Sequence, residues 1–333
     1  MKYLPALMAS VRGQTLRDFT VLVIDNASSD GAIEFLRAQY PEVTILRNAK
    51  NLGFSGAHNQ GIRYALAAWR DAPRTLRYVL VTNPDIIFTP TFLEKMVAAA
   101  DAHTDGAVFG GKLLKVLRQG EGPLAETIET KIIDSTGLRM ARSRRTTDRG
   151  AGEEDRGQYD AAHEIFGVSG ALACYRASAL EAVRIGEEYF DNDFFAYKED
   201  ADIAWRLRLH GFRAYYIPQA LAYHFRRAYG RERAGLRELI RNRRAKSGLV
   251  NYLSYRNHLL MLVKNEQWAN ILLHLPWIVV YECGKLVSLL LFEPRTLRAL
   301  GSFLRLVPRI LVKRRTVMAK CRVRAREIRR WFA

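Results

Sequence analysis

The stretch TVLVIDNASSDG, residues 20–31, indicates the fold class of this chain. Residues 20–24 are apolar or β-branched and Asp25 follows at once, a pattern typical of a buried strand that ends in a turn. Residues 33–40 have helical spacing, residues 43–47 form a second short strand, residues 56–69 a helix, and residues 78–82 a third strand. Strands that alternate with helices predict a doubly wound α/β fold with a largely parallel sheet.

Polar residues follow two of these predicted strands. Asp25 follows the first, and residues 83–85, Asn-Pro-Asp, follow the third. In doubly wound sheets the ligand lies at the carboxyl ends of the strands, so the topology places a candidate site here. Taken alone, Asp25 and Asp85 could equally be turn residues.

The charge of the chain is concentrated in its last third. The 333 residues contain 52 Lys and Arg against 34 Asp and Glu, a net charge of +18. Residues 1–225 have 27 basic and 28 acidic side chains, net −1, whereas residues 226–333 have 25 and 6, net +19. A neutral body with a basic, partly apolar tail favours an anionic membrane surface over nucleic acid as the partner. Three widely spaced cysteines indicate neither a zinc site nor a disulfide framework.

The tail has two apolar runs, residues 271–281 and 286–292, separated by residues 282–285. Each run is shorter than the roughly 18–20 apolar residues of a membrane-spanning helix, so we expect in-plane or re-entrant attachment. Residues 295–330 contain 13 basic side chains and the single acid Glu327, which suits anionic lipid headgroups. The alternative is a buried helical hairpin over residues 271–292. Residues 142–163 are charged and lack periodicity, and we expect a mobile surface loop there.

Six motifs occur in a definite order: DNASSDG at 25–31, NLGFSGAHN at 51–59, NPD at 83–85, FGVSGA at 166–171, EDADIAWR at 199–206, and His224. In this order and spacing, the sequence resembles the family-2 inverting glycosyltransferases, and within them the rhamnosyltransferase-like branch. The resemblance covers about residues 2–265. It implies the GT-A nucleotide-diphospho-sugar transferase fold, α/β with a doubly wound mixed sheet, over residues 1–230. Residues 231–333 would be a helical, basic, membrane-associated region.

The resemblance also implies roles for individual residues. Asp25 and Asn26 would contact the base and ribose of a nucleotide-diphospho-sugar donor, and Asn51, Gly53 and Asn59 would line the diphosphate side. Gly167–Ala171 would wall the acceptor pocket. The donor-binding set is completed by Asp30, Asn83 and Asp85, and the residues of the acceptor wall are Gly167, Ser169, Gly170 and Ala171.

Transfer with inversion requires that the charge on the leaving diphosphate is neutralised and that the acceptor hydroxyl loses its proton. Mg²⁺ or Mn²⁺ would do the first, with Asp85 and His224 as ligands by resemblance. Asn83 stands where many relatives have an aspartate, which removes one charge from this site. By resemblance Asp200 is the general base, with Glu199 as the fallback.

The helix at residues 200–210 would favour the ionised base, because its positive end lies beside Asp200. Asp202 lies about 200° around that helix from Asp200, so the two cannot face one substrate. We expect Asp202 to form a surface ion pair with Arg206 instead.

The relatives begin with an apolar strand, and this sequence begins at the helix after it. We therefore expect the first strand of the sheet to be missing and to be encoded upstream of Met1. The expected function is metal-dependent transfer of a sugar, rhamnose first, to a lipid-linked or nascent cell-surface glycan at the cytoplasmic face of a bacterial plasma membrane. Alternatives are another hexose, galactofuranose, or a truncated non-catalytic relative that binds membrane or nucleic acid. A homo-oligomer is compatible with the sequence.

Overall fold

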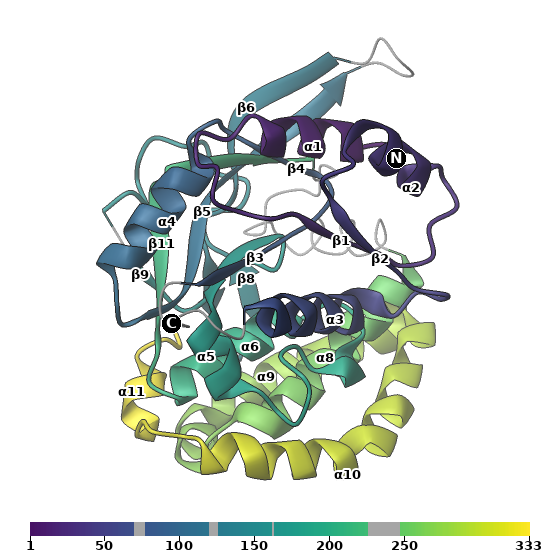
Figure 1. The fold of residues 1–333 in the computed structure, drawn as a ribbon. Coiled ribbons are helices and arrows are strands. Elements are labelled where there is room, and N and C mark those ends of the chain that lie inside the picture. The colour runs from purple at the N-terminus through teal and green to yellow at the C-terminus, as the bar shows by residue number, and fades with distance from the viewer. Residues whose placement is uncertain (70–76, 120–125, 162, 226–246) are drawn as a thin grey trace.

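The computed structural model describes residues 1–69, 77–119, 126–161, 163–225 and 247–333 (Figure 1). The α-helices in these ranges are α1 (Leu4–Arg12), α2 (Ala32–Gln39), α3 (Gly53–Ala68), α4 (Phe92–Ala102), α5 (Ala177–Val183), α6 (Glu199–Leu209), α8 (Gly248–Asn265), α9 (Trp268–Phe292), α10 (Arg298–Ala319) and α11 (Ala325–Arg329). The strands are β1 (Leu22–Asp25), β2 (Thr44–Arg47), β3 (Tyr78–Thr82), β4 (Ile86–Phe88), β5 (Gly106–Gln119), β6 (Glu126–Ser135), β7 (Leu138–Met140), β8 (Thr146–Asp148), β9 (Glu164–Ile165), β10 (Leu172–Arg176) and β11 (Arg213–His224). The predicted boundary between residues 230 and 231 lies outside the described residues.

The main sheet has the order β3-β10-β5-β11-β4, with β6 paired to β5 and β9 paired to β11. Among its described strands only β5 and β11 run parallel, so the sheet is mixed, as the resemblance implied, and the expectation of a largely parallel sheet was wrong. β1 and β2 form a separate parallel pair. Within the described residues β1 has one partner strand, β2.

Helices cover both faces of the main sheet. α1 and α4 share a core with one face, through residues such as Leu7 and Phe92. α5 and α6 pack on the other face, through Leu180 and Ile203. A third core joins the far side of α6 to the C-terminal helices, around the fully buried Trp205. The C-terminal helices α8 to α11 therefore form an outer layer against α6 (Figure 1).

β11 is one strand that continues through a register shift between Ile217 and Leu221. One segment differs from the expectations. Residues 142–161 are not a loose surface loop, because Arg144 is fully buried between the C-terminal helices. Its guanidinium donates to the Glu266 carboxylate and contacts His274 Nδ1 at 2.9 Å, and these bonds fix the segment.

α9 is one continuous helix of 25 residues with Pro276 inside it, so the alternative of a buried hairpin was wrong. By length and composition it is the one helix of the described residues that could cross a membrane, and only 6% of its most apolar window is buried. Its charged residues face inward, because Glu282 accepts from His258 Nε2 at 2.8 Å and Lys285 lies 6.0 Å from the centre of the Tyr255 ring, both on α8. The side chains that α9 exposes are apolar, among them Trp268, Leu272, Leu273, Val280, Val287, Leu290 and Leu291.

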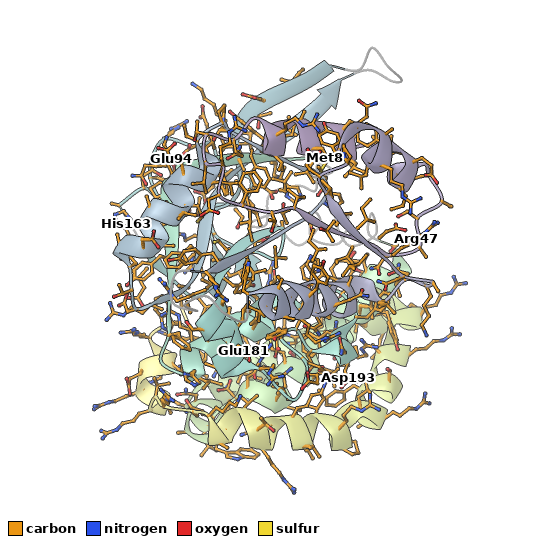
Figure 2. All side chains as sticks on the ribbon, in the orientation of Figure 1. Met8, Arg47, Glu94, His163, Glu181 and Asp193 are labelled. Carbon is orange, nitrogen blue, oxygen red and sulfur yellow. The ribbon has the colours of Figure 1, made fainter. Side chains whose placement is uncertain are left out.

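Part of the basic tail serves the protein itself rather than an outside partner. Lys313 of α10 pairs with Asp191 and, at 2.7 Å, with Glu188. Arg309, also on α10, pairs at 2.7 Å with Asp193, which Figure 2 labels between the α/β body and α10. These ion pairs tie α10 to the loop that precedes α6.

Candidate active site

The candidate metal ligands Asp85 and His224 lie side by side. β4 and β11 are antiparallel with His224 opposite Ile86, and Phe225 N donates to Asp85 O at 3.0 Å. This register brings Asp85 Oδ1 within 3.3 Å of His224 Nε2. The sequence prediction of Asp85 and His224 as a pair is therefore consistent with their placement.

Asp134 completes this group and was not expected from the sequence. Its Oδ2 lies 2.8 Å from His224 Nδ1, and both side chains are buried. β6 and β11 flank β5, where Leu113 pairs with Ser135 on one side and Ala222 on the other. Burial lowers the pKa of His224, but its hydrogen bond to the Asp134 carboxylate and the nearby Asp85 carboxylate outweigh burial and raise that pKa to about 9.

The donor set fits a hard divalent cation. Asp85 Oδ1 is buried and has no hydrogen-bond partner in the described part of the chain, although His224 Nε2 is near it. A carboxylate oxygen and an imidazole nitrogen are ligands that Mn²⁺ accepts, and a buried carboxylate fixes the ring of such a histidine through its other nitrogen. The described residues contain no cluster of three or more candidate ligands, so most of the coordination would come from diphosphate and water.

Asp200 lies at the start of α6 and is held by backbone donors. Its Oδ2 accepts from Gly170 N at 3.1 Å, and its Oδ1 accepts from Ala201 N at 2.7 Å. The neighbouring Ala171 O accepts from Asn83 N at 2.9 Å. Gly170 and Ala171 of the predicted acceptor wall thus contact both the start of α6 and the residue after β3. Asp200 and Asn83 are therefore near each other, one bound to Gly170 and the other to Ala171.

Glu199 and Asp200 have different environments. Burial and the charge of Asp200 raise the pKa of Glu199 to about 8, and its Oε2 has no hydrogen-bond partner among the described residues. Burial also raises the pKa of Asp200, but the N–H of Gly170 and the charge of Lys198 act in the opposite direction. Two backbone N–H groups thus favour the ionised form of Asp200 against the burial that raises its pKa, whereas burial and the charge of Asp200 favour the neutral form of Glu199.

Residues of the predicted donor side form a network at the ends of β1 and β2. Asp25 Oδ1 accepts from Ser28 N at 3.0 Å, and its Oδ2 lies 3.3 Å from Arg47 Nε. Asn26 donates to Gly53 O at 3.1 Å, and Asn51 Oδ1 accepts from Gly53 N at 2.8 Å. Asp25, Asn26, Asn51 and Gly53 are therefore brought together.

Three of the predicted site residues make contacts within the protein instead of facing a ligand site. Asn59 is fully buried and makes four hydrogen bonds to residues 189–192, so its amide is saturated. Asp30 pairs with the amino group of Met1 at the surface, which lowers its pKa. A Cβ on Gly167 would lie 2.2 Å from Ala204 Cβ, so this glycine lets β9 and α6 approach closely. Ser169 is buried beside Gly170.

Asp202 does pair with Arg206, at 3.0 Å, but not at the surface. Both side chains are buried, and Asp202 also contacts Lys264 at 2.9 Å and accepts from Asn265 at 2.7 Å. The expectation of a surface pair was wrong because α8 covers this face of α6.

Comparison with known proteins gives two family matches. The model of "Glycosyl transferase family 2" matches residues 1–184, and that of "Glycosyl transferase family group 2" matches residues 139–306. A curated relative from Mycobacterium tuberculosis, N-acetylglucosaminyl-diphospho-decaprenol L-rhamnosyltransferase, is 28% identical over 231 residues, which cover 67% of this chain and 71% of the relative. A galactofuranosyl glycosyltransferase of Leishmania donovani is 23% identical over 197 residues, 55% of this chain and 43% of that protein.

Among solved structures, GalNAc-T7 crystallised with UDP, GalNAc and Mn²⁺ is similar to this chain with a TM-score of 0.53 and 12% sequence identity. The match covers 79% of this chain and 46% of the GalNAc-T7 chain. This likeness concerns the fold, which is the GT-A fold.

Proposed function

The chain belongs to glycosyl transferase family 2, and we propose that it is a metal-dependent, inverting enzyme that transfers rhamnose from a nucleotide diphosphate to a lipid-linked acceptor. The family match makes it a glycosyltransferase. The mycobacterial relative, named for L-rhamnose and a diphospho-decaprenol acceptor, supports this donor and acceptor. The galactofuranosyl relative supports the second candidate, transfer of galactofuranose or another hexose.

Asp85 and His224 would hold the cation, Mg²⁺ or Mn²⁺, with Asp134 fixing the histidine ring. When bound, the cation would supply positive charge to the leaving diphosphate. The buried Asp85 Oδ1 without a hydrogen-bond partner supports this assignment. Asp25, Asn26, Asn51 and Gly53 would bind the nucleotide side of the donor, since their network lies at the carboxyl ends of β1 and β2.

Asp200 would act as the general base. The acceptor hydroxyl attacks the anomeric carbon of the sugar, its proton passes to an oxygen of Asp200, and the bond to the diphosphate breaks on the opposite side. The observation that carries this role is the pair of backbone N–H groups, of Gly170 and Ala201, that bind the Asp200 carboxylate and favour its ionised form. Gly170 and Ala171 would form the wall against which the acceptor lies.

The test is incubation of purified protein and lipid extract with a panel of nucleotide sugars and Mn²⁺, followed by measurement of nucleotide diphosphate release. We expect one donor to give release that chelation abolishes. Asp200→Asn should lower the rate by about 10²–10⁴ and leave donor binding unchanged, because the amide keeps the shape but cannot accept the proton. Glu199→Gln is the matched control, and an active Asp200→Asn with an inactive Glu199→Gln would move the base to Glu199.

We further propose that residues 231–333 attach the catalytic domain, residues 1–230, to the cytoplasmic face of the plasma membrane. The exposed apolar face of α9, with its charged residues turned inward, supports insertion in the plane of the membrane. The double variant Leu272→Glu/Leu290→Glu should lose binding to phosphatidylglycerol vesicles in a sedimentation assay. Tyr64→Glu, an exposed position on α3, is the control. Undiminished sedimentation of the double variant would place the attachment elsewhere.

A further inference from the structure

The four residues before α6 have an unusual backbone. Phe195, Tyr197 and Lys198 have φ angles of 63°, 71° and 71°, in the left-handed region. For residues with a Cβ each such conformation is strained, and it persists only where the surroundings impose it. Because Glu199 and Asp200 follow immediately, this segment determines where the proposed base begins.

One side chain of α8 binds this segment along its length. Asn257 is fully buried, and its Nδ2 donates to the carbonyl oxygens of Phe194, Ala196 and Tyr197 at 2.8, 2.9 and 2.8 Å. Three acceptors share the two N–H groups of one amide, so no donor of that group is left for another partner.

The preceding residue of α8 supports the amide. Arg256 Nε donates to Asn257 Oδ1 at 3.0 Å, which fixes the orientation of the amide. Arg256 Nη2 also donates to Asp193 O at 2.7 Å and Phe194 O at 3.1 Å. Arg256 and Asn257 thus satisfy successive carbonyls of a loop that has no regular secondary structure of its own after residue 194.

The same loop contacts the predicted donor side. Ser55 N donates to Phe195 O at 3.1 Å, and a Cβ on Gly53 would lie 2.4 Å from that oxygen. The segment 195–198 is therefore held between the start of α3 and the middle of α8.

We propose that Asn257 is a positioning residue, which holds segment 195–198 in its left-handed conformation and thereby sets the place of the Asp200 carboxylate relative to the acceptor. This inference rests on the proposed function of Asp200 as the base. Asn257 itself does not touch substrate.

The test is Asn257→Leu, which keeps the volume and removes all three donors. The control is Asn270→Asp, at another buried asparagine, which lies on α9. Its Nδ2 donates to Ala325 O at 2.9 Å, away from segment 195–198. For Asn257→Leu we expect kcat to fall at least tenfold, the KM for the donor to change less than twofold, and amide hydrogen exchange in peptides covering 195–202 to accelerate at least tenfold. For the control we expect a lower Tm with neither of these changes.

The two measurements separate this inference from the proposed function. Unchanged exchange over 195–202 in Asn257→Leu, or faster exchange with an unchanged kcat, would overturn the positioning role. If Asp200→Asn remained active while Asn257→Leu lost both protection and kcat, the base assignment and the part of the inference that concerns the Asp200 carboxylate would fail, whereas the role of Asn257 in holding segment 195–198 would stand. Asn257→Ala, which creates less crowding, replaces the leucine variant if the latter does not fold.

Discussion

Glu199 provides a test of the acid and base assignment that does not depend on knowing the substrate. Its carboxyl is buried beside Asp200, and its pKa rises from 4.5 to about 8 in the folded protein. Between pH 5 and pH 7 the folded protein keeps this proton, whereas the unfolded chain has largely released it. Stability must therefore fall as pH rises through this window, by about 1.4 kcal/mol per pH unit for one proton.

Between pH 5 and pH 7, the titration of Glu199 should thus lower the free energy of unfolding by about 2–3 kcal/mol. The glutamine of Glu199→Gln cannot titrate. Between pH 5 and pH 7 the free energy of unfolding of this variant should therefore fall by about 2–3 kcal/mol less than that of the wild type. Urea unfolding at constant ionic strength, at pH 5, 6 and 7, measures the difference. Glu34→Gln, at an exposed glutamate of α2, is the control.

Parallel pH profiles for wild type and Glu199→Gln would refute the reasoning. In that case Glu199 is not held protonated, and the environments of Glu199 and Asp200 no longer decide which of them is the base.

Two other predictions concern buried charges. Asp134→Asn should lower the pH at which His224 loses its proton by at least about one unit, because the charged hydrogen-bond acceptor of Nδ1 is lost. NMR titration of the imidazole measures this pH, and an unchanged titration would contradict the contact between Asp134 and His224. Lys264→Met should destabilise the protein by about 3–5 kcal/mol in urea unfolding, since it removes a buried partner of two buried carboxylates, and Lys50→Met at the surface should be neutral. The double variant Lys264→Met/Asp202→Asn should lose less than the sum of the two single changes, and strict additivity would argue against the ion pair.

Local signals in the sequence predicted much of the fold. The apolar run at residues 78–82 coincides with β3, and the helix predicted over residues 200–210 agrees with α6 to within one residue at each end. The pairing of Asp85 with His224 came from the order of the motifs. The arrangement of the sheet did not, because hydrophobic runs do not say whether neighbouring strands are parallel or antiparallel.

The residues that the sequence did not reveal act over long separations. Asp134 and His224 lie on β6 and β11, which both pair with β5, and they are 90 positions apart in the sequence. No spacing rule links two residues at that separation. Asn257 reaches the loop before α6 from about 60 positions away. Arg256 and Asn257 lie among several polar residues of α8, and nothing in their spacing indicates which loop they contact. Arg144 was assigned to a loose loop because a charged residue is usually exposed, whereas here Glu266 compensates its charge.

The bridging position of His224 has a consequence for how a cation would enter. With a pKa of about 9, the imidazole carries a proton at neutral pH, and that proton lies between two carboxylates. A cation that binds Nε2 must displace it, so loading releases a proton into solution and its apparent affinity falls up to about tenfold for each pH unit below 9. Binding of a cation at Asp85 and His224 would therefore be coupled to the loss of one proton, and the negative charge of a bound nucleotide diphosphate would favour positive charge at this place, whether as the proton or as the cation.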